Sequence, residues 1–277
     1  MYETTYHRAT SVSDAVAKLD ASEDAKVLAG GQTLLPTMKQ RLAAPSDVID
    51  VTHIADMKGI TETAGGLRIG AATTHAEVAG SEIVKRMLPG LATLAGHIGD
   101  PHVRHMGTIG GSIANNDPAA DYPSAMVALG ATIVTDKREI AADDFFTGLF
   151  ETALEEGELV KAVKVPACAA SGYAKFANPA SRYAMTGVFV AKHGDGVRVA
   201  VTGAGSDGVF RWSEAEQALS SNFSADAVSG LKADASALMS DIHASADYRA
   251  NLVAVGERHE RGPVPGLHQT RMVLVEG

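Results

Sequence analysis

Two glycine-rich segments carry the residue types best suited to holding a phosphorylated cofactor. The first, AGGQT at 29–33, lies between a predicted short strand at 26–28 and a helical pattern that begins near Thr33, with Pro36 in its first turn. Glycines lack a Cβ atom, so the backbone can turn sharply and direct N–H groups at an anion. Proline is tolerated in a first helical turn because its missing N–H has no helical partner. Taken alone, the glycine pair is more typical of a plain strand-to-helix turn.

The second segment, GTIGGS at 107–112, is expected to be a loop that supplies further free N–H groups and two hydroxyls. Asn115 and Asp117 add polar side chains just downstream. Two such segments far apart in the sequence suit a dinucleotide, because a pyrophosphate flanked by ribityl and ribose groups needs donors on more than one side. Neither segment contains G-x-G-x-x-G, which disfavours a Rossmann site for NAD. The segments alone indicate a phosphate-bearing cofactor.

The elements that must position these segments alternate between helices and strands. A helix is predicted over 11–20 with Ser11 or Ser13 as its N-cap, and one or two helices over 77–99 with a break at Pro89-Gly90. Further predicted elements are strands at 26–28, 47–51, 66–74, 131–135 and 158–166 and a helix at 122–129. After a linker at 167–172 the pattern predicts strands at 172–177, 185–192 and 196–205, then helices from Ser213.

Composition limits the class of protein. The 277 residues, 45% of them hydrophobic, are enough for a sizeable core in two or three subdomains. The single cysteine, Cys168, excludes an internal disulfide and an iron–sulfur cluster held by about four cysteines of this chain. A net charge of −9 argues against nucleic-acid binding. An anionic cofactor must therefore be attracted by local N–H groups and helix N-termini.

The sequence predicts neither a membrane-spanning segment nor a secretory signal. No apolar run reaches the roughly 18 to 20 residues that a membrane span needs. The first residues alternate polar and apolar side chains and include an early acid, unlike a secretory signal. We expect a cytoplasmic protein without a membrane span.

Four runs of the sequence closely resemble one known family. They are AGGQTLLPTMKQRLA, IGAATTHAEV, GDPHVRHMGTIGGSIANNDPAADYPSAMVAL and KFANPASRYAMTGVFVA. They are similar to the medium, FAD-binding subunit of the carbon monoxide dehydrogenase and xanthine dehydrogenase family of molybdenum hydroxylases, in the expected order over about residues 1–255. The resemblance implies an α+β protein. A two-subdomain FAD-binding fold of the vanillyl-alcohol-oxidase/PCMH type is expected at 1–166, with subdomains at about 1–55 and 56–166. A C-terminal α+β flavoprotein domain with a small antiparallel sheet and helices is expected at 172–277.

The resemblance also implies which residues bind FAD. They are Ala29, Gly30, Gly31, Gln32, Thr33 and Leu34 from the first segment, Thr108, Ile109, Gly110, Gly111 and Ser112 from the second, and Gly99, Asp121 and Tyr183 elsewhere. Several relatives have histidine where this chain has Gln32. Asp121 is expected near the ribityl chain or the flavin ring, and a helix N-cap is the alternative. Tyr183 is expected beside the isoalloxazine, and a half-buried strand aromatic is the alternative.

A cluster of histidines beside the second segment has metal-ligand chemistry. His97, His102, His105 and Asp100 are of suitable types. The resemblance instead gives this stretch the role of shaping the flavin pocket, and no metal is expected in this subunit. Thr74 and His75 match a turn that flanks the pocket, for which a purely structural role is favoured.

No catalytic triad or pair of carboxylates emerges, which suits a chain whose cofactor performs the chemistry. The resemblance implies an electron-transfer subunit that receives electrons from 2Fe-2S clusters of a small subunit, after substrate oxidation on a large molybdopterin subunit. NAD⁺, a quinone or oxygen would accept the electrons from this chain. The expected assembly is a dimer of heterotrimers. One alternative is a stand-alone FAD-dependent oxidase or dehydrogenase. Such an enzyme needs its own substrate-binding domain, and the part of the chain after the linker is small for that role. Another is a non-enzymatic flavin-binding assembly protein.

The C-terminus departs from the family pattern. The last helix, which opens near Asp247, is predicted to end near Arg261, because Gly262-Pro263 and Pro265-Gly266 follow. Residues 262–277 are expected to form an extended tail outside the flavin site. Alternatively, the apolar run Met272 to Val275 could dock on a partner or a second copy.

Overall fold

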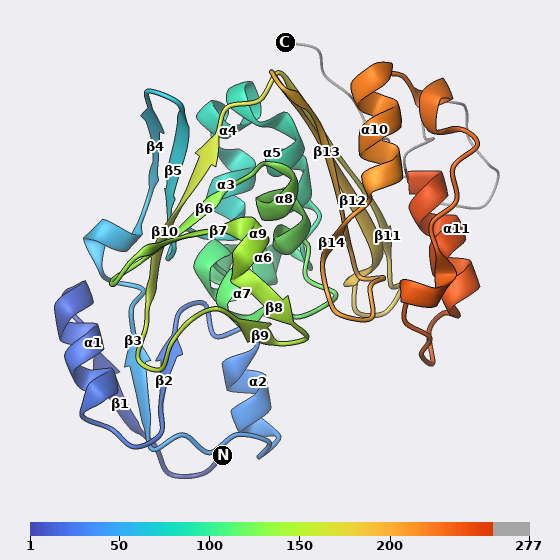
Figure 1. Ribbon diagram of the computed structural model, residues 1–277. Coiled ribbons are helices and arrows are strands. Elements are labelled where there is room, and N and C mark those ends of the chain that lie inside the picture. The colour runs from blue at the N-terminus through green and yellow to red at the C-terminus, as the bar shows by residue number, and fades with distance from the viewer. Residues whose placement is uncertain (257–277) are drawn as a thin grey trace.

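The computed structural model describes residues 1–256 (Figure 1). The predicted helix end near Arg261 and the tail at 262–277 lie outside these residues. The described chain mixes helices with four sheets, as the α+β class predicts. Within it, no helix is long and apolar enough to cross a membrane.

The N-terminal residues form a parallel three-stranded sheet. Its strands lie in the order β1 (Thr5–Arg8), β3 (Asp47–Asp50) and β2 (Ala25–Leu28), connected by α1 (Val12–Asp20) and α2 (Leu34–Lys39). Ser11 caps α1 as predicted, because its side chain accepts a hydrogen bond from the Asp14 N–H. The carboxyl ends of parallel strands meet at one edge of a sheet, where ligands commonly bind. The AGGQT segment leaves β2 at this edge.

The second sheet is antiparallel and has β10 at its centre. Its strands lie in the order β4 (Ile60–Thr63), β5 (Gly66–Gly70), β10 (Val160–Pro166), β6 (Thr132–Thr135) and β7 (Glu139–Ala141). The chain between β5 and β6 forms α3 (His75–Gly80), α4 (Glu82–Met87), α5 (Pro89–Gly96), α6 (Pro101–Met106), α7 (Ile109–Asn115) and α8 (Tyr122–Ala128). The smaller elements are η1 (Ala55–Met57), α9 (Ala142–Phe145) and the pair β8 (Phe146–Gly148) and β9 (Glu151–Thr152).

Two predictions for this region need correction. The pattern at 77–99 forms three helices, because Ser81 both ends α3 and caps α4, whereas the expected break is confirmed where Pro89 begins α5. The second glycine segment is not a loop. Thr108 is the N-cap of α7, so Gly110 and Gly111 lie in its first helical turn.

A third, antiparallel sheet follows, as expected for the C-terminal part. Its order is β11 (Ala170–Ala177), β12 (Ala184–His193), β13 (Gly196–Thr202) and β14 (Phe210–Arg211). β11 begins inside the predicted linker at 167–172, which is therefore shorter than expected. α5 and α8 contact one face, and α10 (Ser213–Ser221) and α11 (Ala246–Gly256) contact the other (Figure 1). The short helices η2 (Ala225–Val228) and η3 (Ala235–Ala237) lie between α10 and α11 in sequence.

The third sheet is buried on both faces, which explains the continuous apolar run in β12. Phe189 and Ala191 join the large core around α5 and α8, whereas Val188 and Val190 join the core under α10 and α11. Alternate residues of a strand point to opposite faces, so both sets are apolar. This arrangement packs β11 against α5, and β12 and β13 against α8.

Candidate functional site

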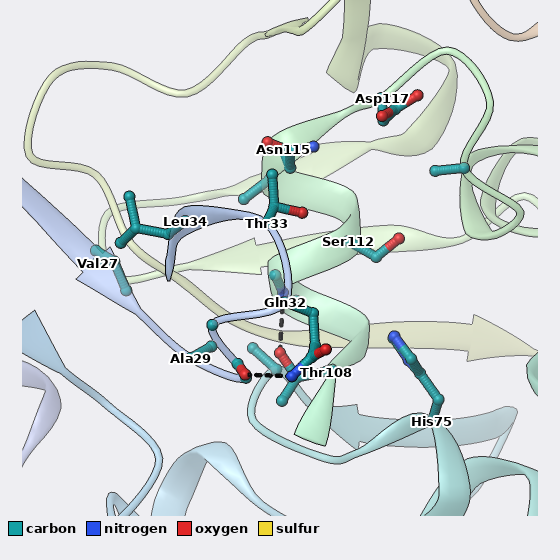
Figure 2. A pocket seen from close by; sticks show the side chains of 18 of the residues that line it. Val27, Ala29, Gln32, Thr33, Leu34, His75, Thr108, Ser112, Asn115 and Asp117 are labelled. Carbon is teal, nitrogen blue, oxygen red and sulfur yellow. Dashed lines mark hydrogen bonds between the residues drawn. The ribbon is translucent and has the colours of Figure 1, made fainter. Parts of the chain in front are cut away.

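A cavity of about 660 Å³ lies between the end of β2, the start of α7 and the loop before β12. Figure 2 shows residues that line it from the end of β2 and from α7. The cavity gathers all but one of the expected FAD-binding residues. Those that line it are Ala29, Gly30, Gly31, Gln32, Thr33, Leu34, Gly99, Thr108, Gly110, Gly111, Ser112, Asp121 and Tyr183. The exception is Ile109, whose fully buried side chain belongs to the hydrophobic core.

The two glycine segments pack against each other, backbone to backbone. A Cβ atom on Gly30 would lie 2.0 Å from the carbonyl oxygen of Met106. Gly31 has φ +69°, a left-handed conformation that glycine adopts without strain. A Cβ on Gly111 would lie 3.0 Å from the Thr108 hydroxyl oxygen and 3.7 Å from the Cβ of Ala29. We call Gly30, Gly31 and Gly111 the glycine seam.

The first segment presents a run of unpaired donors. Among residues 1–256, the backbone N–H groups of residues 30–34 have no hydrogen-bond acceptor, and the bonds that start α2 begin with the Leu35 N–H and the Gly31 carbonyl. Thr33 is the N-cap residue, but its side chain makes no capping bond. The Gln32 side chain turns back, with Nε2 3.4 Å from the Gly30 carbonyl oxygen (Figure 2). Successive unpaired N–H groups in such a turn form a concave anion site.

The second segment differs, and the prediction that it supplies free N–H groups is wrong. The Ile109 and Gly110 N–H groups donate to the carbonyls of Thr73 and Ala71. The Gly111 N–H donates to the Thr108 hydroxyl at 3.2 Å (Figure 2). The Ser112 N–H closes the helix onto the Thr108 carbonyl. This segment therefore offers the cavity a Cβ-free surface at Gly111 and the Ser112 hydroxyl.

Asp121 carries a buried carboxylate at one end of the cavity. Asp121 occupies the N-cap position of α8, but its side chain makes no capping hydrogen bond. The alternative role as a helix N-cap therefore holds for its backbone position and not for its carboxylate. Its carboxylate accepts hydrogen bonds from the Tyr173 hydroxyl at 2.5 Å and from Lys175 Nζ at 3.0 Å. Lys175 also donates to the His97 carbonyl. Burial raises the pKa of Tyr173, and the nearby Asp121 raises it further.

Sequence reasoning missed Tyr173 and Lys175. The available signal was a lysine inside an otherwise apolar strand segment, Ala174-Lys175-Phe176, because a buried lysine needs an acidic partner. The partner itself could not be chosen from sequence.

Tyr183 lies in the loop between β11 and β12, so the alternative of a strand aromatic is wrong. Its side chain lines the cavity and is 44% exposed. The pKa of the Tyr183 hydroxyl is raised, first by burial and then by the carboxylates of Asp117 and Asp121. Burial also raises the pKa of Asp117.

The other end of the cavity is mostly apolar. Its lining there includes Val27, Leu28, Val51, Met57, Leu159 and Val160. Sequence reasoning did not find them, because apolar residues of separate strands carry no local mark of a shared pocket. Glu158 also lines the cavity, but its carboxylate is paired with Arg138 at 3.0 Å. The Arg138 hydrogen bond lowers the pKa of Glu158 to about 2.

Two of the polar residues at α6, Asp100 and His105, have structural partners. Asp100 caps α6 through the Val103 N–H, and His105 Nδ1 lies 2.7 Å from the Pro101 carbonyl oxygen. Among the described residues, no group of three or more His, Cys, Asp or Glu side chains could hold a metal ion. Gly99 allows the turn before α6 with φ +50°.

Thr74 and His75 lie in one turn but have different surroundings. Thr74 forms a capping box with Glu77, which confirms its expected structural role. The Nδ1 atom of His75 has no hydrogen-bond partner among the described residues. The residue lines the cavity and is only 5% exposed. Burial, with a smaller contribution from Arg104, lowers the pKa of His75 to about 4.

Comparison with known proteins gives consistent matches over most of the chain. The family model for the FAD binding domain in molybdopterin dehydrogenase matches residues 2–168. The nicotine 6-hydroxylase medium subunit of Paenarthrobacter nicotinovorans is 36% identical over 262 residues, covering 90% of this chain and 92% of the relative. The carbon monoxide dehydrogenase medium chain of Hydrogenophaga pseudoflava is 36% identical over 260 residues, covering 88% and 91%. A solved structure of carbon monoxide dehydrogenase from the same organism, lacking the Mo-pyranopterin moiety of its cofactor, matches with a TM-score of 0.81 over 92% of this chain and 95% of that chain, at 36% identity.

Proposed function

The chain belongs to the family of FAD-binding domains in molybdopterin dehydrogenases, and from this premise we propose that it is the electron-transfer subunit of a molybdenum hydroxylase complex. A large subunit with molybdopterin oxidises the substrate, and a small subunit with 2Fe-2S clusters carries the electrons onward. This chain receives them and delivers them to an external acceptor. The proposed assembly is a dimer of heterotrimers.

The observation that carries this proposal is the run of five backbone N–H groups at 30–34 that have no acceptor among the described residues, beside the glycine seam. A pyrophosphate is an anion whose oxygens only accept hydrogen bonds. The net charge of −9 repels it at long range, so short-range donors must hold it. Gly30 lets the first segment pack closely against the chain before α7, Gly31 allows the left-handed turn, and Gly111 keeps a side chain out of the cavity wall beside the first segment. The residues present therefore fit the pyrophosphate of FAD.

The two ends of the cavity suit the two ring systems of FAD. The apolar end, with Leu28, Met57 and Leu159, suits the flat adenine ring. The end with Asp121 and Tyr183 suits the ribityl chain and the isoalloxazine. The bound FAD supplies the one-electron and two-electron chemistry. The chain binds it, orients it through the glycine seam and keeps the charges of Asp121 and Lys175 paired beside it.

The same proposal includes the PCMH-type organisation. The subdomains at about 1–55 and 56–166 are supported by the sheets, since β1 to β3 lie in the first and β4 to β10 in the second. The boundary to a C-terminal domain at 172–277 is supported by the family match, which ends at residue 168.

The substrate is selected outside this chain. Two relatives of equal identity, 36%, are named for nicotine and for carbon monoxide. A subunit that handles only electrons needs no pocket for either molecule.

Purification from the native host tests the proposal. Native mass spectrometry is expected to show the chain with a large and a small partner, and acid release is expected to yield FAD and no FMN. The purified chain alone is expected to pass electrons from reduced FAD to artificial dyes without oxidising the organic substrate of the complex. Substrate-dependent dye reduction by the molybdenum-free chain would support a stand-alone flavoenzyme instead, and absence of FAD after reconstitution would refute the proposal.

A further inference from the structure

His75 is a buried polar residue that lines the cavity. The residue is 5% exposed, and its Nδ1 is fully buried with no hydrogen-bond partner among the described residues. Leaving a buried polar group without a partner costs on the order of 1–3 kcal/mol. Nδ1 bears this cost within the fold, whereas Nε2 is not among the buried, unpaired atoms and is available to a ligand in the cavity.

The backbone holds the His75 ring at the start of α7. The His75 N–H donates to the Gly107 carbonyl at 2.9 Å, and the preceding Thr74 forms a β-bridge with Thr108. A Cβ on Gly107 would lie 2.6 Å from Nε2, so the ring fits only beside a glycine. His75 is thus fixed next to the same helical turn that carries Gly111.

The two ring nitrogens have different surroundings. Nδ1 is fully buried, on a ring that packs at 5.4 Å from the ring of Tyr122. Nε2 is not among the fully buried, unpaired atoms and lies at the Gly107 edge of the ring. The ring lines the cavity and extends toward Ser112 (Figure 2). Nε2 is therefore the atom that a ligand in the cavity can reach.

We propose that His75 is a further FAD-binding residue, whose Nε2–H donates a hydrogen bond to the ribityl–pyrophosphate part of the cofactor. The inference rests on the proposed function. Phosphate oxygens accept hydrogen bonds and do not donate them, so the neutral ring must carry its proton on Nε2. Thr74, one residue earlier, cannot serve this role because its hydroxyl belongs to the capping box with Glu77.

Three full-length variants test the proposal after flavin removal and titration with FAD. His75→Phe keeps a flat ring beside Tyr122 but removes the donor, and His75→Gln restores an N–H donor. His193→Phe is the control, because His193 bonds to the Ala128 carbonyl and does not line the cavity. We expect the Kd for FAD to rise about tenfold in His75→Phe, to stay within about threefold of wild type in His75→Gln, and to be unchanged in His193→Phe.

The thermal stability of the flavin-free protein separates binding from folding. A donor to FAD predicts that flavin-free His75→Phe unfolds at the wild-type temperature or above, since an unpaired buried nitrogen has been removed. A purely structural histidine predicts a lower unfolding temperature with no rescue by glutamine, and this result overturns the inference. Unchanged FAD affinity in His75→Phe also overturns it while leaving the proposed function intact. A wild-type protein that binds no FAD overturns the proposed function, and this inference with it.

Discussion

Lys175 Nζ lies 2.8 Å from Oδ1 of Asp121, and the two side chains expose only 3% and 4% of their surface. The Tyr173 hydroxyl donates to the same carboxylate. A buried ion pair is tolerated only when its partners are complete, because desolvation of an unpaired charge is costly. The end of the cavity where we place the flavin therefore depends on three residues from two distant parts of the chain.

The first prediction concerns this pair. Lys175→Met leaves the Asp121 carboxylate buried without its cation, and we expect the free energy of unfolding to fall by about 3–5 kcal/mol in urea titrations of the flavin-free protein. Adding Asp121→Asn removes the stranded charge, so the double variant is expected to be more stable than the sum of the single losses predicts. Additive losses would show that the two groups do not interact energetically.

The second prediction concerns the glycine seam. Gly111→Val places a branched side chain where the two segments approach, so we expect bound FAD per chain to fall to a small fraction while the circular dichroism spectrum is retained. Gly30→Ala is expected to destabilise the fold itself, because its Cβ would meet the Met106 carbonyl oxygen at 2.0 Å. Gly65→Ala is the matched control, since nothing lies within 4 Å of its Cβ position. Full FAD content in Gly111→Val would remove this segment from the binding site.

The third prediction is a pH dependence caused by His75. Its pKa is about 4 in the folded protein and about 6.5 in the unfolded chain, so the unfolded state binds the proton first as the pH falls. The contribution of neutral His75 to the free energy of unfolding is fully present above about pH 6.5. It is lost as the pH falls to about 4, by at most about 3 kcal/mol. Urea unfolding of the flavin-free protein across this range measures it. His75→Phe is expected to lose this part of the slope, and an identical slope in the variant would contradict the assignment.

The fourth prediction concerns Tyr183. Because its ring lines the cavity from the loop before β12, removing it in Tyr183→Ala is expected to expose the bound isoalloxazine and to increase the fluorescence of bound FAD. Tyr248→Ala is the control. That ring is similarly exposed, at 43%, but packs on Phe176 and does not line the cavity. Equal fluorescence in both variants would place the isoalloxazine away from Tyr183.

Much of the fold follows from local sequence. The Ser11 cap, the start of α5 at Pro89 and the continuous apolar run of β12 each reflect constraints that act within a few residues, and the structure has them where the sequence predicts. One error was local, at a missed N-cap, and the other arose where a second element pairs with the segment. Ser81 divides one predicted helix into two, and β11 extends into the predicted linker because it pairs with β12 over its full length.

The glycines at 30, 31 and 111 could be identified from the sequence alone, because the room that a turn leaves beside its backbone is a local property. Their pattern indicated a phosphate-bearing cofactor. Only the tertiary structure decided which N–H groups are free. Those of Ile109 and Gly110 are used by the Thr73 and Ala71 carbonyls, which belong to the chain after β5. Likewise, Asp121 meets Lys175 across 54 positions of sequence. Hydrogen bonds and buried charges are satisfied by whatever the fold brings within about 3 Å, and sequence spacing does not contain that information.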